Sequence, residues 1–244
     1  MYLEEYLEAV GRLFEQIRTT QIDAIKQAAA VIANSLANRG AVAVMDTGHM
    51  LKYEAFTRAG GLVALMPFGY AFSVEHTVEH REAAGTPEQE ADVEARKVAL
   101  ALDAAKLKAG DVIVINSNSG RTANVIEVAL QCKDRGITTI GISSREQMGK
   151  CDVAHVSGRK LFDVADVCID NCGPHGDAMI PVKDNEKMCP ASGLAATYIF
   201  WAVHAEVVER LQASGKNPTI FRSVHVGGRE SIEEQRKQFR EKGI

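Results

Sequence analysis

Residues 111–133 read DVIVINSNSGRTANVIEVALQCK, and this stretch decides the expected fold. The apolar run from Asp111 to Ile115 has the length of a buried strand, and the apolar period of Ala123 to Lys133 is that of a helix. A short loop rich in hydroxyls and glycine joins the two. A strand followed at once by such a loop and a helix is half of a βαβ unit.

The same alternation extends through most of the chain. Four more segments have strand character, at 41–45, 62–66, 138–142 and 166–169. Helical patterns separate the strands or follow the last of them, at 51–58, 91–107 and 193–211. Strands alternating with helices predict a doubly wound, flavodoxin-like α/β fold, a three-layer αβα sandwich around a five-stranded parallel sheet. Ligands of this architecture bind at the carboxyl ends of the strands, where the strand order reverses.

The two ends of the chain differ from this middle part. Apolar residues from Leu3 to about Leu36 recur at three-to-four spacing, which predicts one long helix or two. Such a helix can pack on its own core or lie across a partner. We expect three parts. Residues 1–36 form an N-terminal helical segment that contacts another subunit, residues 37–216 form one domain, and residues 217–244 form a C-terminal tail. Residues 73–90 and the tail show no regular pattern.

Composition excludes several classes of protein. With 28 basic and 32 acidic residues the formal charge is −4, which argues against a general nucleic-acid binder. No apolar run reaches the ~18 to 20 residues of a membrane span, and the first residues carry glutamates where a signal peptide needs lysines and an apolar stretch. We therefore expect a cytoplasmic protein with no membrane or nucleic-acid partner. The five cysteines are an odd number and are expected to be free thiols.

The loop at 117–122 is the strongest functional signal. Unpaired N–H groups and the helix dipole favour an anion at a helix start, the hydroxyls add donors, and glycine lets the backbone come close. An ordinary Thr122 cap is the alternative, but it leaves the other hydroxyls unexplained. The sequence has neither a dinucleotide nor a P-loop pattern, so we expect one phosphate and no cofactor. The predicted phosphate residues are Ser117, Asn118, Ser119, Gly120, Arg121 and Thr122.

Other strand ends carry further candidates. The first ends near Gly48 and His49, the fourth in Ser143 and Ser144, and the fifth in a glycine-rich loop with His175; all five are expected to contact a ligand.

Two more candidates stand on predicted helices. Glu54 is four residues before Arg58, so it is either a base facing the strand ends or half of a surface ion pair. His204 stands in an apolar helix, either as a proton-transfer group or as a core histidine.

A metal site is a weaker alternative. Cys168, Cys172, His175 and Cys189 contain the residue types of a Cys₃His zinc site, but their spacing is poor and Cys168 falls in a predicted buried strand. We expect no metal. The histidines and glutamates of residues 76–82 are more simply a solvated polar loop.

Taken together, these residues resemble the sugar isomerase (SIS) domain family of phosphosugar isomerases and phosphosugar-binding proteins. The loop Ser117 to Thr122 is similar to the family's Ser-x-Ser-Gly-x-Thr phosphate loop, and the likeness spans about Asn38 to Leu211. Thr47-Gly48-His49, the segment 54–62 and the tail segment 221–228 resemble a subgroup often labelled as phosphoheptose isomerases.

This resemblance implies the SIS fold and an aldose–ketose isomerisation of a sugar phosphate. Ser117, Ser119 and Thr122 would hold the phosphate, with Ser143 or Ser144 assisting. Glu54 and His204 stand where the family has its acid/base pair, which works through an enediol and needs no cofactor. The family's habit of building sites from two subunits implies a homodimer or homotetramer, in which His204 can serve a neighbour.

Two residues depart from the subgroup. Asp46 and Met50 stand in place of a usual glycine and serine, which removes a hydroxyl and adds a carboxylate near the sugar. The departures leave two alternatives open, a non-catalytic phosphosugar-binding or regulatory module and a phosphosugar lyase or etherase.

Overall fold

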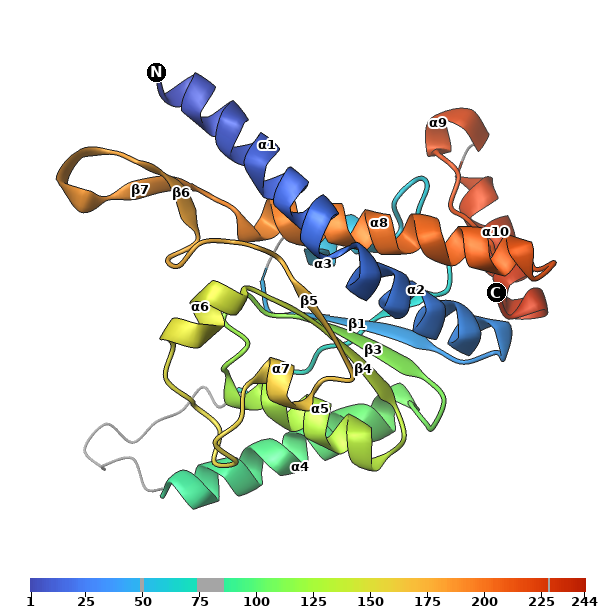
Figure 1. The fold of residues 1–244 in the computed structure, drawn as a ribbon. Coiled ribbons are helices and arrows are strands. Elements are labelled where there is room, and N and C mark those ends of the chain that lie inside the picture. The colour runs from blue at the N-terminus through green and yellow to red at the C-terminus, as the bar shows by residue number, and fades with distance from the viewer. Residues whose placement is uncertain (49–50, 74–85, 228) are drawn as a thin grey trace.

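The computed structural model of the protein describes residues 1–48, 51–73, 86–227 and 229–244. Its centre is a five-stranded parallel sheet with the order β2-β1-β3-β4-β5, which is the flavodoxin-like order (Figure 1). The strands are β1 (Val42–Asp46), β2 (Leu65–Pro67), β3 (Val112–Asn116), β4 (Thr138–Ser143) and β5 (Val167–Asp170). β2 lies on one side of β1 and β3 lies on the other, so the strand order reverses between β1 and β3. The expected α/β sandwich and its parallel sheet are confirmed.

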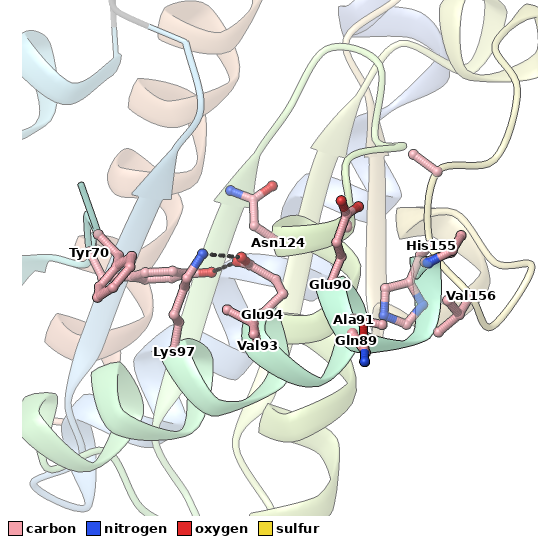
Figure 2. A pocket seen from close by; sticks show the side chains of 14 residues that line it. Tyr70, Gln89, Glu90, Ala91, Val93, Glu94, Lys97, Asn124, His155 and Val156 are labelled. Carbon is pink, nitrogen blue, oxygen red and sulfur yellow. Dashed lines mark hydrogen bonds and ion pairs between the residues drawn. The ribbon is translucent and has the colours of Figure 1, made fainter. Parts of the chain in front are cut away.

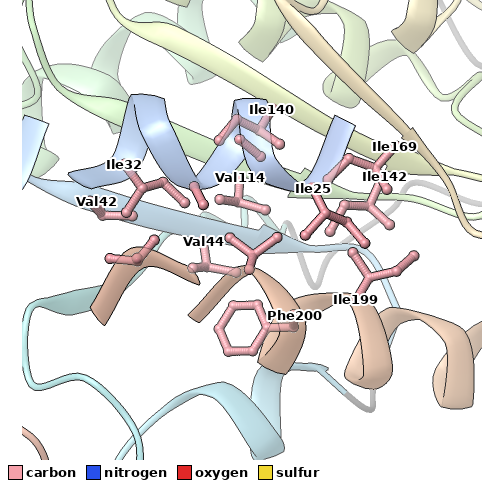
Figure 3. Packing of buried hydrophobic residues seen from close by; sticks show 14 of the residues in the cluster. Ile25, Ile32, Val42, Val44, Val114, Ile140, Ile142, Ile169, Ile199 and Phe200 are labelled. Carbon is pink, nitrogen blue, oxygen red and sulfur yellow. The ribbon is translucent and has the colours of Figure 1, made fainter. Parts of the chain in front are cut away.

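Alternate strand residues face opposite helical layers. In β1, Val42 and Val44 belong to one buried cluster, whereas Ala43 and Met45 belong to the other. Val44 of β1 pairs with Val114 of β3, so side chains that face the same way lie side by side on neighbouring strands. Each face of the sheet is therefore a continuous apolar surface. Figure 3 shows the first face, with the branched side chains of four strands packed against two helices.

Helices cover both faces of the sheet (Figure 1). The first face carries α1 (Tyr2–Thr20), α2 (Ile22–Ala37), α3 (Leu51–Ala55) and α8 (Ser192–Ala213). The second carries α4 (Pro87–Ala105), α5 (Ala123–Asp134) and α7 (Leu161–Val164). None of the helices in the described ranges is both long and apolar enough to cross a membrane.

The expected N-terminal segment is two helices with different roles. The buried face of α2, which includes Ile25, Ala29 and Ile32, belongs to the core of the sheet. In α1 only Leu13 and Ile17 are buried, and its first turns project beyond the sheet beside a hairpin (Figure 1). A cut after residue 36 would therefore remove a core helix as well as a projecting one.

Several elements lie outside the predicted alternation. They are α6 (Arg145–Lys150), the antiparallel hairpin of β6 (Ala178–Pro181) and β7 (Lys187–Pro190), the 3-10 turn η1 (Lys183–Asn185) between them, α9 (Val224–Gly227) and α10 (Glu230–Lys242). The tail is thus largely helical rather than irregular. The strand expected at 62–66 begins later, because Leu62 pairs instead with Ile220 of the tail in an antiparallel bridge.

Candidate functional site: a phosphate loop at the switch point of the sheet

An open cavity of about 740 Å³ lies at the carboxyl ends of β1 and β3, where the strand order reverses. Three groups of residues line it: the ends of β1 and β3, the loop that opens α5, and a wall from distant segments. The first two groups are Asp46, Thr47, Gly48, Asn116, Ser117, Asn118, Ser119 and Thr122. The third is Tyr6, Gln147, Asp177, Cys189, Pro190, Ser192, Gly193 and Leu194. The sheet therefore brings most of the predicted phosphate loop to one cavity.

The loop is held in shape by its neighbours. The carbonyl of Asn118 accepts hydrogen bonds from the backbone N–H of Ser144 (3.0 Å) and the hydroxyl of Ser143 (3.1 Å). The side-chain oxygen of Asn118 accepts a hydrogen bond from the side-chain amide of Asn171 (2.9 Å). Gly120 has φ +55, and a Cβ there would lie 2.7 Å from the Ser143 hydroxyl oxygen. The turn thus requires glycine and presents its hydroxyls in a fixed arrangement.

The start of α5 offers donors to a ligand. Thr122 is the N-cap residue, but among the residues that the structure describes its side chain caps no helical N–H. The ordinary-cap alternative is therefore not what the structure has. The N–H groups of Val125 and Ile126 bond back to the Thr122 carbonyl, which leaves those of Ala123 and Asn124 as the open helix end. Free N–H groups, the helix dipole and the Thr122 hydroxyl together favour an anion at this point.

Ser143 and Ser144 do not line the cavity, contrary to the expectation that they would contact phosphate. Both are completely buried. Ser144 donates to the carbonyl of Gly173 (2.6 Å) and accepts from the N–H of Gln147 (3.0 Å), so it caps α6. Their hydroxyls position the loops around the cavity and are not available to a ligand.

The first strand end contributes an aspartate with local partners. Asp46 accepts hydrogen bonds from the side-chain amide of Asn116 (2.7 Å) and the N–H of Gly48 (3.1 Å). These donors compensate its charge at the rim of the cavity. His49 and Met50, which the sequence analysis singled out, lie outside the described residues.

The far wall was not predicted, because it comes from segments distant in sequence. Asp177 has φ +66 and caps α8, accepting from the N–H (2.8 Å) and hydroxyl (2.7 Å) of Ser192. The positive end of α8 is therefore already matched by a carboxylate, whereas that of α5 is open. Tyr6 on α1 and Cys189 on β7 complete the wall. Asp177 follows directly on the glycine-rich loop with His175 that was predicted after the fifth strand, and this loop was the one sequence signal for the wall.

Two predicted loop residues lie apart from the cavity lining. Arg121 directs its guanidinium to the backbone carbonyl of Asp152 at 3.4 Å. His175 is exposed in the loop before the hairpin, next to Gly176, whose N–H donates to Gln147 (2.7 Å). Neither side chain is among those that line the cavity.

Glu54 forms an ion pair rather than facing the cavity. Its carboxylate lies 3.3 Å from the Arg58 guanidinium, and the Glu54 side chain is 31% exposed. This is the pairing that four-residue spacing on a helix favours. The short helix α3 packs against α8, which carries His204.

His204 is a core residue of the single chain. It stands twelve residues after Ser192, about 18 Å along α8 from the cavity wall. It is 6% exposed, its Nδ1 donates to the Phe200 carbonyl (2.6 Å), and its Nε2 is buried without a partner among the described residues. Burial lowers the pKa of His204 to about 4, so the imidazole is neutral at pH 7.

The cysteines do not converge on a metal-binding arrangement. Cys168 donates to carbonyls of the α7 region, whereas the Cys172 sulfur lies 3.8 Å from the Thr20 hydroxyl. Burial raises the pKa of both thiols, which disfavours the thiolate that a metal needs. No group of three metal-ligating side chains occurs within the described ranges.

A flavodoxin-like sheet with a hydroxyl-rich loop and an open helix N-terminus at its switch point is typical of α/β proteins that bind small anions. Within that class, the chain belongs to the SIS domain family, whose description matches residues 5–144, more than half of its length.

Sequence relatives extend over the whole chain. A UPF0309 protein of Caldanaerobacter subterraneus subsp. tengcongensis is 34% identical over 98% of this chain and 99% of its own length. One of Thermoanaerobacter pseudethanolicus is 34% identical over 93% of each chain.

Solved structures share the fold at low identity. The phosphoheptose isomerase of Neisseria gonorrhoeae is 20% identical with a TM-score of 0.53, over 87% of this chain and 97% of that one. The phosphoheptose isomerase of Francisella tularensis is 16% identical with a TM-score of 0.52, over 84% and 94%. At these identities the likeness concerns the fold alone.

Proposed function

We propose that this protein binds a sugar phosphate in the cavity at the switch point and interconverts its aldose and ketose forms. The observation that carries the proposal is the loop from Ser117 to Thr122, which lines the cavity at the open N-terminus of α5. Its hydroxyls and N–H groups are donors, and the two carboxylates at the wall, Asp46 and Asp177, already accept hydrogen bonds from Asn116 and Ser192. One phosphate fits these donors better than any neutral group does.

The rest of the cavity suits the sugar. A volume of about 740 Å³ is in the range of ligand sites, and it exceeds what a phosphate group fills. Thr47, Gln147 and Tyr6 offer hydroxyl and amide groups at the wall. Such groups can bond sugar hydroxyls, while Leu194 and Pro190 can pack on carbon atoms.

The second component of the proposal, after binding, is the isomerisation of the sugar phosphate. The solved relatives include phosphoheptose isomerases, and the resemblance assigns proton transfer to Glu54 and His204. One group removes a proton next to the carbonyl and the other moves a proton between the oxygens. Because neither side chain lines the cavity of its own chain, these roles require a second copy, whose cavity Glu54 and His204 would serve.

A homodimer or homotetramer is therefore part of this proposal. The projecting turns of α1 carry Leu3 (64% exposed) and Leu7 (61% exposed), and Tyr6 of the same turns lines the cavity. Exposed apolar residues beside a ligand site favour a protein contact there. A second copy seated on α1 would thus lie next to the sugar.

A non-catalytic phosphosugar-binding module is the second candidate, and His204 is the observation that favours it. The imidazole is buried, neutral at pH 7 and already bonded to the Phe200 carbonyl. The Nε2 atom that would accept a proton is buried in the core, and His204 does not line the phosphate-loop cavity of its own chain.

Solvent-exchange NMR separates the two candidates. The protein is incubated in D₂O with pentose, hexose, heptose and N-acetylamino sugar phosphates, and deuterium is followed at the carbon next to the carbonyl. We expect exchange and aldose–ketose interconversion with one class of sugar, lost in Glu54→Gln and retained in Asp152→Asn, a change at an exposed aspartate of another loop. Tight binding of that sugar without deuterium uptake would overturn the isomerase and leave the binding module.

A further inference from the structure

A second cavity, of about 730 Å³, lies on the other side of the α5 N-terminus (Figure 2). Its walls are the start of α4, the first turn of α5, the chain after β2 and the loop at residues 154–156. The side chains that define its chemistry are Tyr70, Phe72, Glu90, Glu94, Lys97 and Asn124. None of these residues lines the phosphate-loop cavity.

Its surface combines aromatic faces with hydrogen-bonding groups. Phe72 is 70% exposed, and Val93 and Val156 add exposed apolar surface at 47% and 64%. The Tyr70 hydroxyl donates to Glu94 at 2.6 Å, which fixes the ring at the wall. In Figure 2 the amide of Asn124 and the carboxylate of Glu90 lie between this aromatic end and His155. A ligand with an apolar face and a hydroxylated edge matches such a surface.

The charges exclude a second phosphate. Among the described residues that line the cavity, Lys97 is the one amine, and its Nζ lies 3.4 Å from the Glu94 carboxylate and 5.4 Å from the centre of the Phe72 ring. Glu90 adds another carboxylate. Two acids against one paired amine among the described lining residues disfavour an anionic group, so a second phosphate does not suit this surface.

A buried polar side chain stiffens the far wall. The His155 side chain is 7% exposed, and its Nε2 lies 3.0 Å from the Glu127 carboxylate. Its Nδ1 lies 2.8 Å from the Ser157 hydroxyl. Held from both ring nitrogens, His155 fixes the 154–156 loop against α5, so this wall is formed before a ligand arrives.

The two cavities are neighbours at the edge of the sheet. Thr122 lines one and Ala123 the other, and consecutive Cα atoms are about 3.8 Å apart. A third hollow at the end of β1 and β2, of about 530 Å³, shares Asp46 with the phosphate-loop cavity and Tyr70 with the second cavity. A ligand anchored at the phosphate loop would have to extend past Asp46 and Tyr70, along this third hollow, to enter the second cavity.

We propose that the second cavity binds an additional, uncharged sugar ring, so that the substrate class is a glycosylated sugar phosphate and not a simple monosaccharide phosphate. This inference rests on the proposed function, because the phosphate at residues 117–122 anchors the ligand. A pyranose ring supplies both features that the cavity selects, a C–H face for Phe72 and Tyr70 and hydroxyls for Asn124 and Glu90.

Calorimetric titration tests the proposal with defined probes. The 6-phosphates of lactose, cellobiose and trehalose are compared with those of glucose and galactose. We expect at least one disaccharide phosphate to bind about tenfold more tightly than its monosaccharide counterpart. In Phe72→Ala and Glu90→Ala this gain should disappear, while monosaccharide phosphate affinity stays the same, because both residues line only the second cavity. Leu100→Ala is the matched control, since Leu100 is equally exposed at 70%, stands on the same helix as Glu90, and lines neither cavity.

The outcomes distinguish the two proposals. If no sugar phosphate binds, the proposed function fails and this inference falls with it. If monosaccharide phosphates bind but no disaccharide phosphate binds more tightly, or the gain survives in both variants, only the second sugar subsite is overturned. Because Phe72 and Glu90 are both exposed, the variants are expected to fold, which thermal unfolding checks.

Discussion

Gly120 is the residue on which the shape of the phosphate loop depends. A Cβ at this position would lie 2.7 Å from the Ser143 oxygen and 3.2 Å from the Leu161 Cβ, at a φ of +55. We expect Gly120→Ala to lower the free energy of unfolding by about 1 to 3 kcal/mol and to weaken sugar phosphate binding. Urea unfolding and calorimetry measure the two effects.

Gly11 provides the matched control for that change. It lies in the middle of α1, and a Cβ there meets nothing within 4 Å. Gly11→Ala should therefore stabilise the protein by up to about 1 kcal/mol through helix propensity. Equal effects of the two substitutions would contradict the account of the loop.

His204 predicts a pH dependence of stability. Its pKa falls from 6.5 to about 4 on folding, so the unfolded chain binds the proton more readily between these values. The stabilising contribution is complete above pH 6.5 and is lost as the pH falls toward 4, by about 3 kcal/mol. Urea unfolding from pH 7 to 4 measures it.

His204→Leu should remove this component of the pH dependence and keep the fold at pH 7, since leucine leaves no unpaired nitrogen in the core. Turnover assays on the same variant then report on chemistry separately from stability. A wild-type stability that stays level between pH 6.5 and 4.5 would contradict the buried, neutral imidazole.

Asp177 caps the N-terminus of α8 and so stabilises a whole helix. Asp177 reaches across the hairpin to the N–H groups of Ala191 and Ser192. Asp177→Ala leaves these donors without their carboxylate, and we expect a loss of about 1 kcal/mol in thermal or urea unfolding. Asp152→Ala, at an exposed aspartate, should change stability by less than about 0.5 kcal/mol. Similar losses in both would show that Asp177 is no cap.

At this scale the strands and helices of the sandwich could be predicted, because their apolar periods are local. The hairpin could not, although Asp184 and Asn185, with φ 58 and 65, form the kind of turn that joins two short strands. Its strands are four residues each and lack a clear alternation. The loop at residues 117–122 is contiguous, so the sequence alone could single it out as the candidate phosphate loop. The wall formed by Tyr6, Cys189 and Ser192 depends on tertiary packing.

The exposure of individual side chains could not be predicted from the sequence either. The positions of Glu54 and His204 in the helices gave no information about which way each side chain faces. The surface alternative for Glu54 and the core alternative for His204 describe their placement in the single chain. Serines 143 and 144 show the same limit, since adjacent hydroxyls after a strand can serve a ligand or a loop.

At the scale of the whole molecule, the projecting half of α1 predicts self-association. Leu3 and Leu7 lie one turn apart on α1 and are both exposed. We expect Leu3→Glu combined with Leu7→Glu to convert an oligomer into monomers in sedimentation velocity, with no loss of stability. Leu100→Glu, on the opposite helical layer, is the control and should keep the oligomer. An unchanged mass in the double variant would place the interface elsewhere.

The loop at residues 117–122 is proposed to hold the phosphate of a sugar. Its most direct test is calorimetric titration of sugar phosphates and the matching unphosphorylated sugars into the wild type, Ser119→Ala, Thr122→Val and the control Thr19→Val. We predict binding that requires the phosphate and weakens about tenfold or more in each loop variant, but not in the control. Equal affinity for the unphosphorylated sugar, or full affinity in both loop variants, would contradict the claim.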